Sequence, residues 1–177
     1  DLALVPDVPR KVDGGHATLA HGAVHLVLAR QPFTQAVDLL QTATQKQTGQ
    51  ERVLSLYYRG AILNRLGRHR EAVANLDEAL AERPDLIAAR EERGEALWQM
   101  GAREQATQAW TEALKLSPNM PLTNYVLAGA AAAQNSADSA AKYEQKADSV
   151  TPNNAHFHWM LGLRLQNLKF SEFAEKR

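Results

Sequence analysis

Residues of matching size and type recur at a fixed interval of 34 positions through the middle of the chain. The recurring pairs are Gly60 and Gly94, Gly67 and Gly101, Ala72 and Ala106, Leu76 and Trp110, Ala79 and Ala113, and Pro84 and Pro118. A fixed interval of this size is typical of repeat proteins, in which each unit buries its apolar face against its neighbours. The period therefore predicts a stacked array of similar units.

The residue types within the units favour helices. Ala, Leu, Gln, Glu and Arg dominate at helical spacing, and no stretch of alternating β-branched residues fits a strand. The first residues differ, because Pro6, Pro9 and the pair Gly14 and Gly15 remove backbone donors and loosen the chain. We expect an extended arm over residues 1–16 and helices from residue 17 onward.

The 34-residue frame also sets the boundaries of the units. Extended in both directions, it predicts units at about residues 17–52, 53–86, 87–120 and 121–154, and a partial unit over residues 155–177. The first unit is the weakest, because Pro32 falls in its turn and Thr48 stands where later units have Pro. In the unit at 121–154, Ala128 replaces Gly, and we expect its helix pair to be the loosest of the regular units.

Two segments, YYRGAILNRLGRHREAVANLDEALAERP and REERGEALWQMGAREQATQAWTEALKLSP, resemble the tetratricopeptide repeat at almost every defining position. The resemblance covers most of the chain. It implies an all-α, right-handed superhelical solenoid of stacked antiparallel helix pairs. Gly60, Gly94 and Gly162 would let paired helices approach closely, while Leu76 and Trp110 would fill the space between successive helix pairs.

Composition and charge exclude several classes of function. The chain has 20 Lys and Arg against 20 Asp and Glu, so it lacks the positive charge that nucleic-acid binding requires. No apolar run approaches the roughly 20 residues of a membrane-spanning helix. The absence of cysteine excludes disulfides and thiolate metal sites. We expect no nucleic-acid partner and no insertion into a membrane.

The sequence contains none of the common catalytic or phosphate-binding motifs. His21 and His25 lie one helical turn apart and could face a metal, but no third ligand accompanies them, and a solvated pair is the better interpretation. The adjacent Glu91 and Glu92 fit a solvated helix face better than an acid–base pair. We expect no enzymatic activity, no cofactor and no metal.

The family resemblance also implies a binding site. In tetratricopeptide repeats the first helix of each unit lines the concave face, where partner peptides bind. Carried over to this sequence, the concave positions predict a partner-binding site of Tyr57, Asn64, Glu91, Glu95, Trp98, Tyr125 and Gln166. The aromatic side chains would act as anchors with polar specificity between them. For Tyr57, a place in the core is an equal alternative.

One subtype of the family holds a carboxylate ligand with Lys and Asn at these concave positions, and this sequence lacks that clamp. Glu91 and Glu95 instead place negative charge in the middle of the predicted groove. Such a charge favours a ligand that carries Arg or Lys flanked by apolar residues.

The function implied is a non-catalytic scaffold that binds a partner peptide or protein segment in its concave groove. Two alternatives stay open. The last unit stops within its second helix, which also fits the repeat region of a larger enzyme or export protein, such as a glycosyltransferase or an exopolysaccharide-secretion protein. The other is a homo-oligomer in which the apolar arm LALVPDVP lies in a neighbour's groove.

The chain begins at Asp1, so we expect any signal peptide to be absent already, and the sequence does not distinguish cytoplasm from periplasm.

Overall fold

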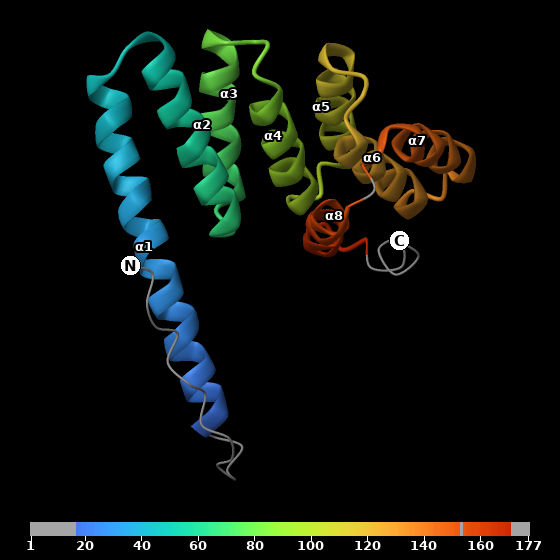
Figure 1. The fold of residues 1–177 in the computed structure, drawn as a ribbon. Helices are drawn as coiled ribbons and strands as arrows, with labels where there is room; N and C mark the ends of the chain where they lie inside the picture. The colour runs from blue at the N-terminus through green and yellow to red at the C-terminus, as the bar shows by residue number, and fades with distance from the viewer. Residues whose placement is uncertain (1–16, 153, 171–177) are drawn as a thin grey trace.

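The computed structural model describes residues 17–152 and 154–170, with side chains from residue 31 onward. The helices in this part of the chain are α1 (Ala17–Lys46), α2 (Gly49–Arg65), α3 (His69–Glu82), α4 (Ile87–Gln99), α5 (Arg103–Leu116), α6 (Pro121–Ala133), α7 (Ala137–Val150) and α8 (Ala155–Asn167). The described residues contain no strand, and the helices follow one another as stacked pairs (Figure 1). The prediction of an all-α solenoid is confirmed. The arm predicted over residues 1–16 lies outside the described residues.

The same left-handed turn ends the first helix of each regular unit. The residue at this turn has a positive φ angle in every case, with Gly67 at 78°, Gly101 at 81°, Asn135 at 58° and Lys169 at 61°. The next amide donates back into the last helical turn, as from Arg68 to the carbonyl of Leu63 at 2.9 Å. Glycine adopts this backbone without steric cost, which explains its recurrence every 34 residues in the first two turns.

Glycines also set the close approach of the paired helices. A Cβ atom placed on Gly60 would lie 2.7 Å from Cγ of Leu76, and one on Gly94 would overlap the indole of Trp110. Both predicted close approaches are therefore confirmed. At Gly162 no described atom lies within 4 Å of the same position, and the second helix of that unit, predicted within residues 171–177, lies outside the described residues.

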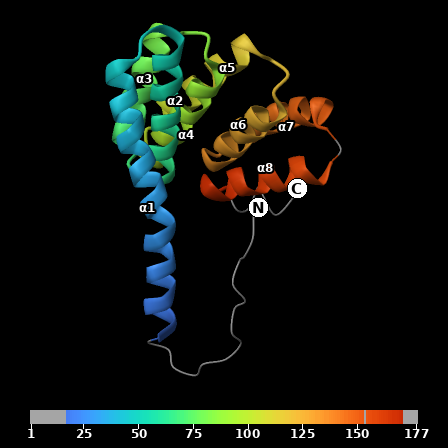
Figure 2. The same cartoon turned by 60° about the vertical axis from the view of Figure 1, so that its left-hand side comes forward.

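The first predicted unit is one helix instead of a pair. α1 continues through Pro32 for 30 residues, so the turn expected at this proline does not form. Proline removes a single backbone hydrogen bond, which a long helix can lose without ending. The second half of α1 packs on α2, where Val37 is buried beside Leu63. The first half projects away from the other helices in both orientations (Figures 1 and 2).

The weak contact in the stack lies between units and not within one. α6 and α7 pack as closely as the pairs before them, so the expectation of a loose pair at 121–154 is wrong. By contrast, α5 packs on α6 much less than α3 packs on α4. One apolar cluster nevertheless extends from Trp98 and Trp110 to Leu161, Leu165 and Phe170. The last helix, together with Leu168 and Phe170 after it, therefore belongs to the core of the second half of the molecule.

α8 lies against α6 much as α4 lies against α2, but it lacks the packing on the preceding helix that α4 has on α3. Its backbone lies close to α6, and it does not pack closely on α7, which precedes it in sequence. Long side chains of α8 reach α4 instead, and in Figure 2 α8 runs beneath α6 and α7. α8 therefore turns back over the face formed by α4 and α6.

Candidate partner-binding surface

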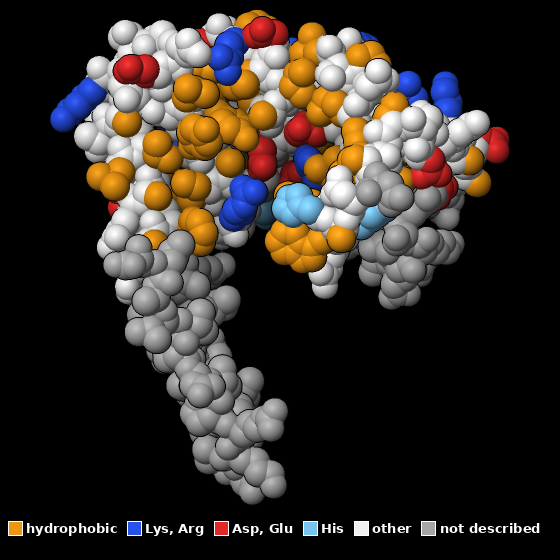
Figure 3. Space-filling view, in the orientation of Figure 1, with side chains coloured by type: hydrophobic (Ala, Val, Ile, Leu, Met, Phe, Trp, Pro, Cys, Tyr) orange, Lys and Arg blue, Asp and Glu red, His pale blue; other side chains and the backbone are white. Residues whose placement is uncertain are grey.

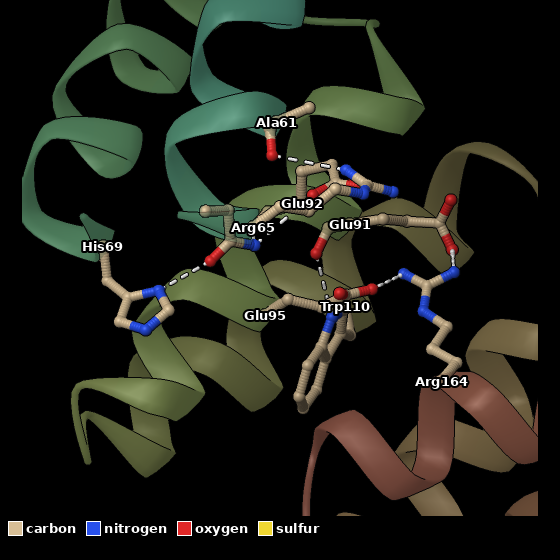
Figure 4. Close-up of polar contacts among 9 residues, drawn as sticks. Ala61, Arg65, His69, Glu91, Glu92, Glu95, Trp110 and Arg164 are labelled. Carbon is tan, nitrogen blue, oxygen red and sulfur yellow. Dashed lines mark hydrogen bonds and ion pairs between the residues drawn. The ribbon is translucent and has the colours of Figure 1, made fainter. Parts of the chain in front are cut away.

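Three glutamates gather on the face of α4 that α8 covers. Glu91, Glu92 and Glu95 are separated by one and three residues, which places them on one side of the helix. Their side chains are only 15 to 18% exposed. They are labelled in Figure 4, and acidic side chains appear at the bottom of the hollow in Figure 3. The acidic cluster predicted for the middle of the groove is thus assembled, with Glu92 as an additional member.

Arg164 of α8 points into this cluster (Figure 4). Its guanidinium pairs with Glu95 and lies 3.5 Å from Glu91. Glu91 also accepts a hydrogen bond from the buried hydroxyl of Thr123. Because charged groups with little access to water need partners, these contacts compensate the burial of the glutamates.

Burial changes the proton affinity of Glu95. Loss of water raises the pKa of its carboxyl from 4.5 to about 7, and the neighbouring Glu91 and Glu92 act in the same direction. Arg164 opposes this change because it favours the carboxylate. The pKa of Arg164 lies above its usual value, since attraction to the three glutamates exceeds the effect of its own burial. Arg164 is therefore a permanent cation beside a carboxyl that titrates near neutral pH.

α2 and the turn after it form the opposite side of the cluster. The amide of Asn64 donates to the carboxylate of Glu92 at 3.3 Å, and Arg65 lies 3.8 Å from the same residue. Nδ1 of His69 lies 2.7 Å from the side-chain oxygen of Asn64, so Nδ1 must donate the hydrogen bond. Burial lowers the pKa of His69, which keeps the ring neutral at pH 7.

A hollow of about 490 Å³ opens between the α2–α3 turn, α4 and α8. Its lining residues are Asn64, Arg65, Gly67, His69, Glu92, Glu95, Gln99 and Asn167. Two predicted site residues, Asn64 and Glu95, therefore meet in one cavity. Its size falls within the range of small-molecule sites, but the lining is polar and charged, which suits a polar or cationic side chain better than an apolar ligand.

Tyr57 lies near the acidic cluster but, like Glu91, is not among the residues that line this hollow. Tyr57 is half-buried on α2, and burial and the charge of Glu92 together raise the pKa of its hydroxyl. The ring of Tyr57 lies 5.0 Å from that of Tyr58, which is 54% exposed. Tyr57 is thus half-buried and lies near Glu92 of the acidic cluster.

Trp98 and Tyr125 lie in the core, contrary to the expectation that they line an open groove. Their exposures are 4% and 3%. The indole of Trp98 donates to the carbonyl of Leu168 at 3.1 Å and meets the edge of Phe170 at 4.9 Å. The hydroxyl of Tyr125 donates to Asp148 at 2.5 Å. Trp98 is covered because α8 and the residues after it occupy the space that an open groove would leave.

Gln166 is exposed but is not part of the hollow. It is 100° around α8 from Leu165 and 160° from Leu168, which are both buried, so it faces away from α4. The structure thus brings Asn64, Glu91 and Glu95 together with Tyr57 nearby, and separates Gln166 from them.

Arg164 is the functional residue that sequence reasoning missed. Its neighbours in the chain are Leu163 and Leu165, so it matches the predicted ligand, an arginine flanked by apolar residues. The sequence predicts an arginine between apolar residues as the ligand of the acidic positions, but that prediction places the arginine in an external partner. Arg65 and His69 gave no signal, because both lie near a turn whose position relative to α4 depends on the stacking of the units.

Within residues 17–152 and 154–170, no group of three or more metal-binding side chains comes together. No helix in the same ranges is both long and apolar enough to cross a membrane. The side chains of His21 and His25 lie outside those that the structure describes.

The fold and this surface define a helical repeat protein with a concave face. The chain belongs to the tetratricopeptide repeat family, because the family model described as Tetratricopeptide repeat matches residues 22–87 and 91–155, more than half of its length. Such repeats are in general non-catalytic interaction modules. No curated protein matches the chain at a significant level.

Solved structures with a similar fold are distant in sequence. MamA from Desulfovibrio magneticus RS-1 is 22% identical, with a TM-score of 0.62 over 93% of this chain and 92% of that one. YrrB, described as a TPR protein with an unusual peptide-binding site, is 20% identical, with a TM-score of 0.63 over 87% and 76%. A chain of the CopN-Scc3 complex is 14% identical, with a TM-score of 0.59 over 67% and 69%. These likenesses establish the shared fold.

Proposed function

We propose that the chain is a non-catalytic scaffold that binds a segment of a partner protein on its concave face. The observation that carries this proposal is the hollow between the α2–α3 turn, α4 and α8, which contains Glu92 and Glu95. The peptide-binding site named for YrrB supports a peptide as the class of ligand for this fold.

The charges of the hollow favour a partner with a lysine or arginine side chain. Glu92 is held only loosely by Arg65, whose side chain is 62% exposed and lies 3.8 Å away. An exposed ion pair of this kind contributes about 0 to 1 kcal/mol, so an incoming cation can replace it at little cost. The half-buried ring of Tyr57 offers an apolar contact beside the charge.

The remaining predicted residues have other roles in this proposal. Trp98 and Tyr125 support the site from the core, because they fix α4 and α6 and do not touch the partner themselves. Glu91 and Glu95 are already paired with Arg164, so Glu92 is the acid that contacts the ligand. Gln166 lies outside the contact surface.

A peptide-binding measurement with a reversed charge tests the proposal. Labelled peptides that contain one lysine or arginine between leucines are titrated with the protein, and fluorescence anisotropy reports binding. We expect Glu92→Lys to weaken binding about tenfold or more, because it places a like charge in the hollow. Glu104→Lys makes the same change at an exposed site on α5 and serves as the matched control. Equal affinities of the two variants would remove the proposal.

A further inference from the structure

The second half of α1 exposes residues whose equivalents in α3 are buried. Three residues of α1 recur in α3 at an interval two residues longer than in the later units, as the pairs Ala36 and Ala72, Leu40 and Leu76, and Ala43 and Ala79. The three members in α3 are completely buried where α3 packs on α2, the first helix of its pair. The three members in α1 are only half-buried. α1 therefore has the face on which the first helix of a pair lies, without such a helix on it.

Two more residues belong to the same face. Leu39 is 72% exposed, whereas its equivalent Asn75 is 6% exposed and accepts a hydrogen bond from Arg59 of α2 at 2.8 Å. Tyr58 of α2 is 54% exposed, whereas Glu92, 34 residues later, contacts the first helix of the preceding pair. Hydrophobic side chains are visible over α1 and α2 in Figure 3. The open face consists of Ala36, Leu39, Leu40, Ala43 and Tyr58.

The repeat pattern assigns residues 17–31 to this open face, as the first helix of the first unit. The family match begins at residue 22, so it includes most of this segment. Residues 17–29 contain no Asp, Glu, Lys or Arg, and the open face is also uncharged, so the two suit each other in charge and polarity. In the structure, however, the segment is the first half of α1 and projects away from the open face (Figures 1 and 2). The segment and the face are therefore apart within one chain.

The straight course of α1 through Pro32 favours a second copy over the chain's own segment. In the next pair, Leu56 lies in one apolar cluster with Ala79, and Leu63 lies in another with Ala72. The equivalent contacts of the first unit join residue 20 to residue 43 and residue 27 to residue 36, and both are centred between residues 31 and 32. Two straight α1 helices in antiparallel orientation, related by a two-fold axis at that point, make these contacts at both ends. The chain's own segment could make them only if the helix ended near Pro32.

We propose that α1 pairs in antiparallel orientation with α1 of a second copy of this chain, so that residues 17–31 of each chain cover the open face of the other. The contact buries Leu39, Leu40 and Tyr58, which a single chain leaves at least partly exposed, and this burial offsets the cost of association. The dimer is separate from the peptide contact proposed above, which uses Glu92 and the hollow. Either proposal can fail without the other.

The absence of cysteine from the chain makes the pairing directly measurable. A chain with only Ala20→Cys and a chain with only Ala43→Cys are unfolded, refolded together, treated with a short bis-maleimide and separated by denaturing electrophoresis. Along one straight α1 these positions are about 35 Å apart, beyond the reach of the reagent. A cross-link between the two chains requires that residue 20 of one lies near residue 43 of the other.

Two controls accompany this mixture. A single chain with both Ala20→Cys and Ala43→Cys shows whether the segment folds back on its own chain, because only that conformation gives a cross-link within one chain. A mixture of the Ala20→Cys chain with a Lys142→Cys chain, whose cysteine is exposed on α7, measures cross-linking by random collision.

The expected result is a two-chain band in the first mixture and in the doubly substituted chain, at least tenfold stronger than in the Lys142→Cys mixture. Light scattering of the wild-type chain should give a mass near twice 19.5 kDa. The pairing is overturned if the doubly substituted chain cross-links only within itself, or if the first mixture gives no two-chain band or one no stronger than the Lys142→Cys mixture. A wild-type mass near 19.5 kDa would equally overturn it.

Discussion

The two halves of the described chain share their local structure and differ in how their helices stack. From α2 to α5 each helix packs on the one before it, and α2 lies against α4. From α6 to α8 the helix pair and the turn geometry recur, but α6 packs weakly on α5, and α8 lies against α6 instead of α7. The 34-residue pattern therefore determines the pairs and their turns. The stacking of the second half depends on residues that are not repeated, among them Arg164 and Phe170.

Truncation of Phe170, which belongs to the second half, should cause the largest loss of stability among the predicted changes. Its ring packs on Trp98 and would overlap a Cβ atom on Gly129, so it fills the gap between α4 and α6. We expect Phe170→Ala to lower the free energy of unfolding by about 3 to 5 kcal/mol, as for other buried aromatic residues. Chemical denaturation followed by tryptophan fluorescence measures the loss.

Phe33→Ala is the matched control for this prediction. Phe33 lies in α1 and is 44% exposed, so we expect a change within about 0.5 kcal/mol. A similar loss in the free energy of unfolding for both variants would mean that Phe170 does not pack between α4 and α6.

Arg164 should contribute more to stability than an arginine of the first half that faces the same acidic cluster. Arg164→Ala leaves Glu91 and Glu95 buried without their cation, and we expect a loss of about 3 kcal/mol, the lower end of the range for breaking a buried ion pair. Arg65→Ala removes a guanidinium that is 62% exposed and lies 3.8 Å from Glu92, while Asn64 still donates to that carboxylate, so the free energy of unfolding should change by at most about 1 kcal/mol. Denaturant titration measures the free energy of unfolding of the two variants. Equal losses of stability would contradict the burial of Arg164.

Much of the first half could be predicted from the sequence because its signals are local. Gly60 and Gly94 indicate a close approach of the two helices of a pair, and Gly67 and Gly101 indicate a left-handed turn between them. Both features depend only on interactions within one helix pair. The continuous helix through Pro32 could not be predicted in this way. A proline is compatible both with a turn and with a continuous helix that lacks one backbone hydrogen bond. Which of the two forms depends on packing against other helices, and the repeat pattern does not include that packing.

The residues of the candidate site come together as predicted only where the stacking of the helices is regular. Asn64, Glu91 and Glu95 meet because α2 and α4 adopt the arrangement typical of the family. Trp98 and Tyr125 occupy equivalent positions, but whether a groove residue is open or covered depends on where α8 lies. The residues for that contact can be seen in the sequence, as an arginine between two leucines and as two glutamates in α4. Nothing in the sequence indicates that they contact one another within one chain.

The acidic cluster should make stability depend on pH. Burial in the folded protein raises the pKa of Glu95 from 4.5 to about 7, with Arg164 opposing the change and Glu92 and Glu91 adding to it. Between these pH values the folded state keeps a proton that the unfolded chain has lost, so the free energy of unfolding falls as pH rises. Each pKa unit corresponds to about 1.4 kcal/mol, and the total fall from this group should be at most about 3 kcal/mol.

Glu95→Gln tests this dependence because it retains a polar side chain without the titration. We expect the difference in the free energy of unfolding between the variant and the wild type to shift in favour of the variant from pH 5 to pH 7, by about 1 to 3 kcal/mol. Glu104→Gln, on the exposed side of α5, should leave the pH dependence as it is in the wild type. Parallel curves for Glu95→Gln and the wild type would contradict the raised pKa.

The smallest predicted effect concerns the turn that both halves share. Gly67 and Gly101 adopt positive φ angles without steric cost, whereas Lys169 adopts φ of 61° with a side chain that this backbone disfavours. We expect Lys169→Gly to raise the free energy of unfolding by up to about 1 kcal/mol, which corresponds to the cost of the left-handed conformation less the greater entropy of glycine in the unfolded chain. Asn135→Gly should give a smaller gain, because asparagine tolerates this conformation.

Gly101→Ala provides the reverse change in the first half and should destabilise by about 1 kcal/mol, since nothing but the φ angle of 81° opposes a methyl group there. Thermal denaturation of the three variants at one pH resolves differences of this size. If Lys169→Gly lowers stability while Gly101→Ala behaves as expected, the end of α8 does not form the turn that ends α2 and α4. The position of α8 over Trp98 would then rest on side-chain contacts such as those of Arg164, Leu165 and Phe170, and the local similarity of the two halves would stop at Asn135.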